Sequence, residues 1–121
     1  MSQQFGRRVR LRSHAEFVVV QDEGRRVAAR YLTVLGRPNT VGCDRLGIIA
    51  SRKLGGAVVR NRAKRRLREV FRQLEPDLSA AKGFRTLDLV IVPRRESLTA
   101  PLSALAAEFS SSLRRLRSTH G

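Results

Sequence analysis

One amphipathic segment constrains the fold of this chain more than any other feature. Between Ser51 and Arg72 the sequence carries nine Lys or Arg residues and a single acid, Glu69. Apolar residues recur in it at spacings of three and four, which collects them in one sector of an α-helix: Val59, Ala63, Leu67, Val70, Phe71 and Leu74. Such a sector must be buried, so we predict a helix over about 58–75, ended by Pro76, whose apolar side faces a core.

The sector beside the apolar one contains only cations and an amide. It is about 100° wide in helical projection, and its members are Asn61, Lys64, Arg65, Arg68 and Arg72. A solvated helix face normally places Lys four residues from Glu, whereas Lys64 and Arg68 repel each other at that spacing. Counterion release favours the binding of such a face to phosphates. We therefore interpret it as a phosphate-binding face, with a plain solvated face as the alternative.

The charge of the whole chain also indicates a polyanionic partner. Among 121 residues there are 25 Lys or Arg against 10 Asp or Glu, a net charge of +15. A charge of this size attracts phosphates from a distance. An anionic membrane is the rival partner, but no apolar run approaches the roughly 20 residues of a spanning helix, and no signal-peptide segment begins the chain. We expect a cytoplasmic, nucleic-acid-binding protein without membrane contact.

Cysteine and histidine provide no disulfide or zinc framework. Cys43 is the only cysteine, so an internal disulfide cannot form. His14 and His120 lie near opposite ends of the chain and lack zinc-ligand spacing with Cys43. Whether the protein binds another metal stays open.

The first half of the chain predicts a short helix and two strands. Ser13 and Glu16 form a capping-box pattern for a helix over 15–22, which Gly24 ends. The β-branched and aliphatic residues of 27–35 and 45–51 predict strands. Turn residues over 38–44 favour an antiparallel hairpin between these two strands.

The second half, beyond the basic helix, adds a strand and a last helix. The apolar run over 87–92, closed by Pro93, predicts a buried third strand. Thr99 is a candidate N-cap for the helix, with Pro101 in its first turn. One apolar stripe follows at helical spacing: Leu102, Leu105, Phe109, Leu113 and Leu116.

Together these elements predict the α+β class. In the order α-β-β-α-β-α they form a two-layer sandwich of a small mixed β-sheet with helices largely on one face. We expect a single domain over 13–117, preceded by a basic N-terminal arm over 1–12 and followed by a tail over 118–121. The arm has four arginines and no acid, so we expect it to be ordered only in part, or on binding.

Two features of the basic segment favour RNA as the nucleic acid. Arg outnumbers Lys there, and a guanidinium suits bidentate phosphate contacts and stacking on exposed bases. Gly55 and Gly56 permit close approach of the backbone to a phosphate at the helix N-terminus, with a plain turn as an equal alternative.

A motif of fixed spacing runs from Ser51 to Arg68. A Ser and a Lys precede a Gly, followed by Ala-Val, Arg-Asn and spaced cations: Ser51, Lys53, Gly55, Ala57, Val58, Arg60, Asn61, Lys64, Arg65 and Arg68. This motif resembles the signature of the bacterial ribonuclease P protein subunit family. The similarity covers about residues 9–117 and includes Arg10, Leu11, Glu16, Phe17, Gly24, Arg30 and the Arg45-Leu46-Gly47 strand.

The resemblance implies a fold, partners and a cofactor. The fold has the element order given above, with a left-handed β-α-β crossover around the basic helix, against the usual right-handed rule. The partners would be the catalytic RNA subunit of ribonuclease P and precursor tRNA, with no protein partner required. In that family the RNA subunit, with bound Mg²⁺, cleaves the 5′ leader from precursor tRNA, and the protein tightens substrate binding and metal affinity.

The resemblance also implies site residues. Contacts with the RNA subunit carried over from the motif are Arg52, Lys53, Arg60, Asn61, Lys64, Arg65 and Arg68, and the cationic sector adds Arg72. The candidate contacts with the leader are Arg12, Phe17, Arg30 and Tyr31. Where relatives tend to carry further aromatics this chain has Gln21, Leu32 and Leu35, and Gly56 replaces a common Asn or Lys. The alternative for Phe17 and Tyr31 is a place in the core.

The acids provide no catalytic constellation for the protein itself. Protein-catalysed phosphodiester cleavage needs positioned carboxylates for metal ions, or a His acting as acid or base. The acids here are scattered along the chain. We therefore predict no catalytic residue, with Mg²⁺ bound mainly by the RNA subunit, and an accessory role in the endonuclease that matures the tRNA 5′ end. The alternatives are a non-catalytic RNA-binding protein, such as a ribosomal protein, and, less favoured, a metal-dependent protein nuclease.

Overall fold

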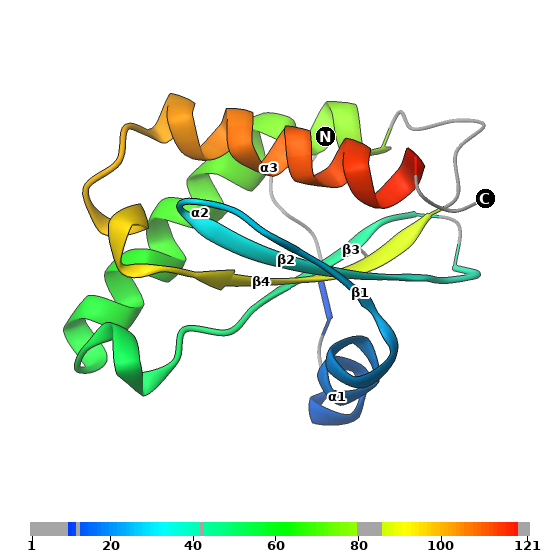
Figure 1. The fold of residues 1–121 in the computed structure, drawn as a ribbon, viewed down its shortest axis with the longest axis horizontal. Helices are drawn as coiled ribbons and strands as arrows, with labels where there is room; N and C mark the ends of the chain where they lie inside the picture. Colours follow the sequence, from blue (N-terminus) through cyan, green and yellow to red (C-terminus); the bar gives the residue numbers. More distant parts are fainter. Residues whose placement is uncertain (1–9, 12, 42, 80–85, 119–121) are drawn as a thin grey trace.

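The computed structural model describes residues 10–11, 13–41, 43–79 and 86–118 (Figure 1). The helices in this part of the chain are α1 (His14–Glu23), α2 (Ala57–Ser79) and α3 (Leu102–Ser118). The strands are β1 (Arg25–Ala28), β2 (Leu32–Pro38), β3 (Arg45–Ile48) and β4 (Leu87–Pro93), and the short 3₁₀ helices are η2 (Arg52–Leu54) and η3 (Arg95–Leu98). The α+β class is confirmed, and so is the predicted order, except that two strands, β1 and β2, stand where one was predicted. None of the described helices is long and apolar enough to cross a membrane.

The four strands form one mixed sheet in the order β1-β2-β4-β3. Strand β2 is antiparallel to both of its neighbours, β1 and β4, and β3 is parallel to β4. The predicted hairpin between the strands at 27–35 and 45–51 is therefore wrong, because β4 lies between β2 and β3. The reason is burial: β4 is apolar on both sides, and a strand of this kind is stable in the centre of a sheet covered on both faces.

The predicted strand over 27–35 is in fact two strands, β1 and β2, joined by a tight turn at 29–31. A carboxylate from α3 holds this turn: Glu108 accepts hydrogen bonds from the backbone N–H groups of Arg30, Tyr31 and Leu32, at 3.2, 2.8 and 2.7 Å. A turn stabilised by a residue 76 to 78 positions away leaves no pattern in the local sequence.

Two apolar cores lie on the two faces of the sheet. Helices α2 and α3 cover one face, as the prediction of helices largely on one face required, whereas α1 lies on the opposite face (Figure 1). In β4, Leu89 and Ile91 belong to the larger core under α2 and α3, while Val90 belongs to the smaller one under α1. This alternation is what a pleated strand imposes. Because β4 supplies both cores, it joins the two layers.

The larger core contains the predicted faces of both long helices. Its α2 members are the buried Leu67, Val70 and Phe71, with Leu74 partly buried, and Ala63 is also buried. The α3 stripe is equally confirmed, with Leu105, Phe109, Leu113 and Leu116 buried and Leu102 packed beside them. The rings of Phe71 and Phe109 meet with their centroids 5.0 Å apart, which is an aromatic contact between α2 and α3.

The helix ends follow the sequence in part. The capping box of α1 is confirmed, since the Ser13 side chain accepts from the Glu16 N–H and the Glu16 carboxylate accepts from the Ser13 N–H. Helix α2 continues past Pro76 to Ser79, so that predicted end is wrong. Proline fixes φ near a helical value, and its cost in a helix does not stop α2 from adding three more residues. Thr99 ends η3 and is not the N-cap of α3, which begins at Leu102.

The entry to α2 uses one glycine for its backbone conformation. Gly55 has a φ of 148°, a value that residues with a Cβ rarely adopt, and a Cβ there would lie 2.9 Å from the Cβ of Val59. The β3-α2-β4 connection joins parallel neighbours, as the resemblance implies. Its left-handed sense stays a prediction.

The predicted basic arm meets the sheet at its last described residues. Arg10 forms a parallel bridge with Leu46, and the N–H of the buried Leu11 donates to the Leu46 carbonyl oxygen at 2.9 Å. Residues 1–9 and Arg12 of the arm, and 119–121 of the tail, lie outside the described residues.

A buried ion pair ties the start of β3 to the end of α3. The Asp44 side chain is 1% exposed, pairs with Arg117, and accepts a hydrogen bond from the Leu87 N–H at 2.8 Å. Asp44→Asn keeps an oxygen for Leu87 and removes the charge that faces Arg117. Because breaking a buried pair costs about 3 kcal/mol or more, we expect the free energy of unfolding in urea to fall by about that amount.

The control is Glu23→Gln, which breaks an ion pair with Arg37 whose side chains are 60% and 39% exposed. An exposed pair contributes less than about 1 kcal/mol. Equal losses in the two variants would contradict the structural importance assigned to Asp44.

Candidate nucleic-acid interface

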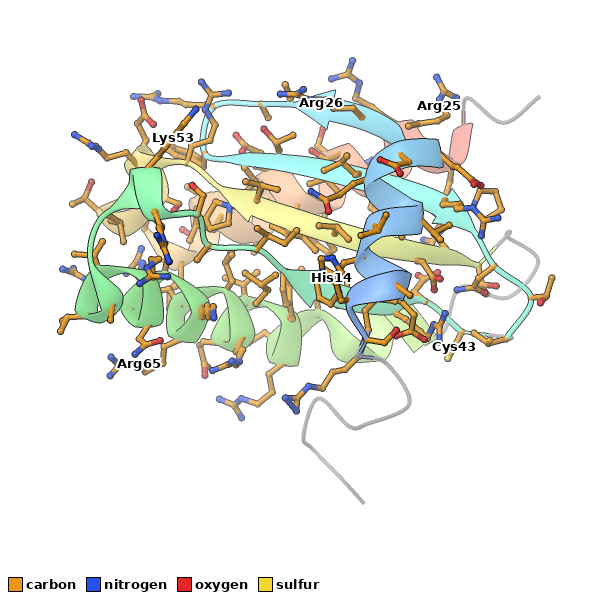
Figure 2. The ribbon with its side chains drawn as sticks, turned by 90° about the horizontal axis from the view of Figure 1, so that it is seen from below. His14, Arg25, Arg26, Cys43, Lys53 and Arg65 are labelled. Atoms are coloured by element: carbon orange, nitrogen blue, oxygen red, sulfur yellow. The ribbon has the colours of Figure 1, made fainter. Side chains whose placement is uncertain are left out.

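The cationic sector of α2 is a surface, as predicted. Asn61, Arg65, Arg68 and Arg72 are exposed and Lys64 is partly buried. Figure 2 shows Arg65 pointing away from the sheet along α2, with Lys53 at the end of the molecule where α2 begins. Acids are scarce here, as Glu69 is the only one between Ser51 and Leu74.

Two hollows divide this surface into two flanks. The first, of about 150 Å³, lies between α1, β3 and α2, and we call it the α1–α2 hollow; its lining is Arg10, Leu11, Phe17, Leu46, Gly47, Ile48, Lys64 and Arg68. The second, of about 380 Å³, is the α2–α3 hollow, lined by Arg62, Arg65, Arg66, Glu69 and Leu102. Lys64 and Arg68 therefore lie beside Phe17, whereas Arg65 faces the other flank. Helical projection alone treated these three cations as one group.

Two of the arginines on α2 are engaged within the protein. Arg66 donates to the carbonyl oxygens of Ser97, at 3.2 Å, and Ala100, which attaches α2 to the segment before α3. Arg72 donates to both carboxylate oxygens of Glu69 at 2.7 Å. This hydrogen bond lowers the pKa of Glu69 and raises the pKa of Arg72. The charge of Arg72 is thus offset, which distinguishes it from Arg65 and Arg68.

The other predicted RNA-subunit contacts lie at or before the first turns of α2. Arg52 and Lys53 are exposed on η2, which the buried Leu54 anchors. Arg60 is half-buried, and its Nε is buried without a hydrogen-bond partner in the described part of the chain. Asn61 is exposed beside it, so the exposed polar side chains at this end of α2 include Arg52, Lys53 and Asn61.

The ring of Phe17, a residue of α1, packs against β3 because Gly47 has no side chain in its way. The ring belongs to the smaller core and also lines the α1–α2 hollow. A Cβ on residue 47 would lie 2.5 Å from the Cε2 and Cζ atoms of Phe17. Gly47 and Arg10 were not predicted as site residues. A glycine inside a strand is the signal that marks such a close approach.

The structure does not bring Arg30 and Tyr31 together with Phe17. Tyr31 packs against the larger core, whereas Phe17 packs in the smaller one on the opposite face of the sheet. The guanidinium carbon of Arg30 lies 5.3 Å from the centroid of the Tyr31 ring, so Arg30 stays with Tyr31. Arg12, the remaining predicted leader contact, lies outside the described residues.

No group of three or more His, Cys, Asp or Glu side chains in the described ranges is arranged to hold a metal ion. The chemistry of the surface is therefore that of donors and cations: guanidinium and ammonium groups for phosphates, and one aromatic ring beside them for a base.

The fold and this surface define a basic α+β domain of the nucleic-acid-binding class. A family model described as Ribonuclease P matches residues 5–117, and the chain belongs to this family. The resemblance inferred from the motif at Ser51 to Arg68 is confirmed, and with it the predicted function as a subunit of ribonuclease P.

Proteins of this family from other bacteria are similar over most of the chain. The ribonuclease P protein component of Thermotoga maritima is 40% identical over 96 residues, which cover 79% of this chain and 78% of that protein. The component from Paramagnetospirillum magneticum is 37% identical over 120 residues, covering 92% and 86%.

Solved structures agree with the fold. The RNase P protein from Thermotoga maritima has a TM-score of 0.72 at 29% identity and covers 93% of this chain and 98% of that one. The Staphylococcus aureus RNase P protein has a TM-score of 0.68 at 27% identity, with 88% and 93% covered.

The packing of Phe17 on Gly47 is testable with a single methyl group. Gly47→Ala places a Cβ within 2.5 Å of the ring, so Phe17 and the first turns of α1 must move. Because overpacking typically costs about 1–3 kcal/mol, we expect a loss of that size in the free energy of unfolding. Gly56→Ala is the matched control, since nothing lies within 4 Å of a Cβ there. Similar losses in both variants would exclude a special role for Gly47.

Proposed function

We propose that this chain, a subunit of the tRNA-processing ribonuclease P, binds the catalytic RNA subunit along α2 and the 5′ leader of precursor tRNA in the α1–α2 hollow. One observation carries the proposal: a single helix has a cationic flank free of aromatics and a second flank where two cations lie beside an aromatic ring. Two different RNA segments can therefore contact α2 from its two sides.

Five RNA-subunit contacts in this proposal lie along α2 and its entry outside the α1–α2 hollow: the exposed Arg52, Lys53, Asn61 and Arg65, and the half-buried Arg60. Guanidinium groups bind phosphates bidentately, and a broad cationic face grips A-form RNA without reading its sequence. Arg72 contributes less than its neighbours, because Glu69 already pairs with it.

The leader contacts centre on Phe17. Its ring provides a stacking surface for a base, while Lys64, Arg68 and Arg10 around the same hollow neutralise the adjoining phosphates. Lys64 and Arg68 thus contact the leader as well as the RNA subunit. Arg12, Arg30 and Tyr31 stay predictions, and for the last two any contact with the leader would be made away from the hollow.

Catalysis in this proposal belongs to the RNA subunit, with Mg²⁺ bound mainly there. The protein contributes cations that offset the repulsion between two polyanions, so its effect is greatest when few magnesium ions are present. A cytoplasmic location is part of the same proposal.

Cleavage of precursor tRNA at low magnesium tests this division of labour. We expect no cleavage by the protein alone, slow cleavage by the cognate RNA subunit alone, and clearly faster cleavage by the two together. Cleavage by the protein alone would contradict the assignment of catalysis to the RNA subunit. An unchanged rate on adding the protein would contradict the accessory role.

The two flanks of α2 are separable by mutation. Arg65→Ala removes one cation outside the α1–α2 hollow, so we expect weaker RNA-subunit binding and a salt slope reduced by about 1, with leader binding unchanged. Phe17→Ala removes a stacking surface worth roughly 1–3 kcal/mol, so we expect weaker binding of precursor tRNA with assembly unchanged. Both quantities come from titrations at several salt concentrations.

Arg114→Ala is the control for charge alone, because Arg114 is exposed on α3. An unchanged salt slope for Arg65→Ala, or a slope reduced as much by Arg114→Ala, would contradict the assignment of the RNA subunit to α2.

A further inference from the structure

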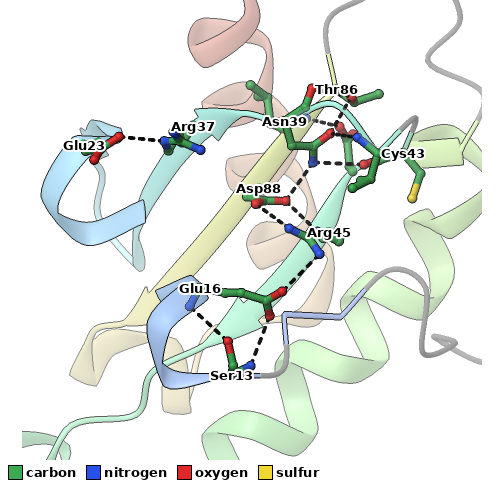
Figure 3. A network of polar contacts seen from close by, with 12 residues as sticks. Ser13, Glu16, Glu23, Arg37, Asn39, Cys43, Arg45, Thr86 and Asp88 are labelled. Atoms are coloured by element: carbon green, nitrogen blue, oxygen red, sulfur yellow. Dashed lines mark hydrogen bonds and ion pairs between the residues drawn. The ribbon is translucent and has the colours of Figure 1, made fainter. Parts of the chain in front are cut away.

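Arg45 of β3 stands at the centre of a polar network beneath α1 (Figure 3). Its guanidinium forms a two-bond ion pair with Asp88 of β4, from Nε to Oδ1 and from Nη2 to Oδ2, both at 2.8 Å. The remaining Nη1 donates to Oε2 of Glu16 in α1 at 3.2 Å. One side chain therefore joins two strands and a helix.

Arg45 is held firmly on the sheet. The Asp88 side chain is only 8% exposed and also accepts from Nδ2 of Asn39 at 2.7 Å. Asn39 is itself fixed, because its Oδ1 accepts from the Thr86 hydroxyl at 2.7 Å. The hydrogen bond to Asp88 raises the pKa of Arg45. With its partners fixed in this way, the guanidinium is a stationary point to which α1 attaches.

Glu16 connects that point to the start of α1. Its Oε1 accepts from the Ser13 N–H at 3.1 Å and so closes the capping box, while its Oε2 accepts from Arg45. The same carboxylate thus satisfies the backbone N–H of the N-cap residue and attaches the first turn of α1 to the sheet. The two hydrogen bonds use different oxygens of one carboxylate, so both form only when the Glu16 side chain is in this orientation.

Apolar contacts alone attach α1 weakly. Val20 is the one buried residue among its ten, and Phe17 is only partly buried. At the far end the Glu23–Arg37 ion pair is exposed. Leu11, two residues before Ser13, ties the chain to β3. Within the first turn, which carries Phe17, the contacts to the sheet are the Glu16–Arg45 hydrogen bond and the surface of Gly47. Arg45 and Gly47 are two apart on β3 and so lie on the same face.

We propose that Arg45 is a positioning residue for the α1–α2 hollow. By holding Glu16 it keeps the first turn of α1 in place, so that the Phe17 ring stays over Gly47 and faces Lys64 and Arg68 across the hollow. This inference rests on the proposed role of the hollow in leader binding. Arg45 itself does not line the hollow, so it affects the leader only by positioning α1.

Glu16→Gln is the most selective test. Glutamine keeps one oxygen for the Ser13 N–H but sets an amide NH₂ against Nη1 of Arg45, while the Arg45–Asp88 pair stays intact. In the reconstituted holoenzyme we expect about fivefold weaker binding of precursor tRNA, a fraction of a full stacking contribution. Binding of the same tRNA without a leader, and assembly with the RNA subunit, should not change.

Glu23→Gln is the matched control, since it removes the same charge from the other end of α1. We expect unchanged leader-dependent binding for this variant. Arg45→Lys is a second disrupting variant that keeps the positive charge, and we expect it to behave as Glu16→Gln does because an ammonium cannot reproduce the planar fork. A fluorine label on the Phe17 ring should shift in both disrupting variants and not in Glu23→Gln.

A double mutant separates positioning from direct contact. If Arg45 and Glu16 act through the ring, Glu16→Gln causes no further loss once Phe17→Ala is present. Additive losses, or unchanged leader binding in Glu16→Gln, would overturn the positioning role while the proposed function stands. If Phe17→Ala alone leaves leader binding intact, the leader site is not in the hollow, and both proposals fail together.

Discussion

Burial of β4 on both of its faces is the constraint on which the rest of the structure depends. With β2 on one side and β3 on the other, β4 supplies Leu89 and Ile91 to the core under α2 and α3 and Val90 to the core under α1. A strand of this kind is stable only when helices cover both faces of the sheet. The position of α1 opposite the two long helices, and the hollow between α1 and α2, follow from that requirement.

The acids of the chain serve mainly inside the fold, and this leaves a cationic surface. Of the eight acids whose side chains are described, six accept hydrogen bonds within the protein: Glu16, Glu23, Asp44, Glu69, Asp88 and Glu108. Asp44, Asp88 and Glu108 pair with partly buried arginines or backbone N–H groups, where an unpaired partner would be costly. The excess of Lys and Arg is then exposed. The composition sets the net charge of +15, and the internal use of the few acids concentrates that positive charge on the surface.

Much of the fold could be predicted wherever the determining contacts are local. The capping box of Ser13 and Glu16 involves residues three apart, and the apolar sectors of α2 and α3 depend only on helical periodicity. Strand order was not accessible in this way. The turn between β1 and β2 depends on Glu108, and nothing near residues 29–31 encodes it. Pro76 gave a wrong helix end for a different reason. A proline is unfavourable inside a helix, but it does not always end one, and α2 continues to Ser79.

For the site, the sequence by itself determined the chemistry: a long helix with a cationic side, a family motif from Ser51 to Arg68, and Phe17 as an aromatic candidate. Only the tertiary structure decided how these parts are grouped. It placed Lys64 and Arg68 beside Phe17, Arg65 on the other flank, and Tyr31 on the opposite face of the sheet. It also set Gly47 under the ring and Arg45 under Glu16. Periodicity describes residues that are close in the sequence. These groupings depend instead on which strands pair and which elements pack on them, and no local sequence pattern contains that information.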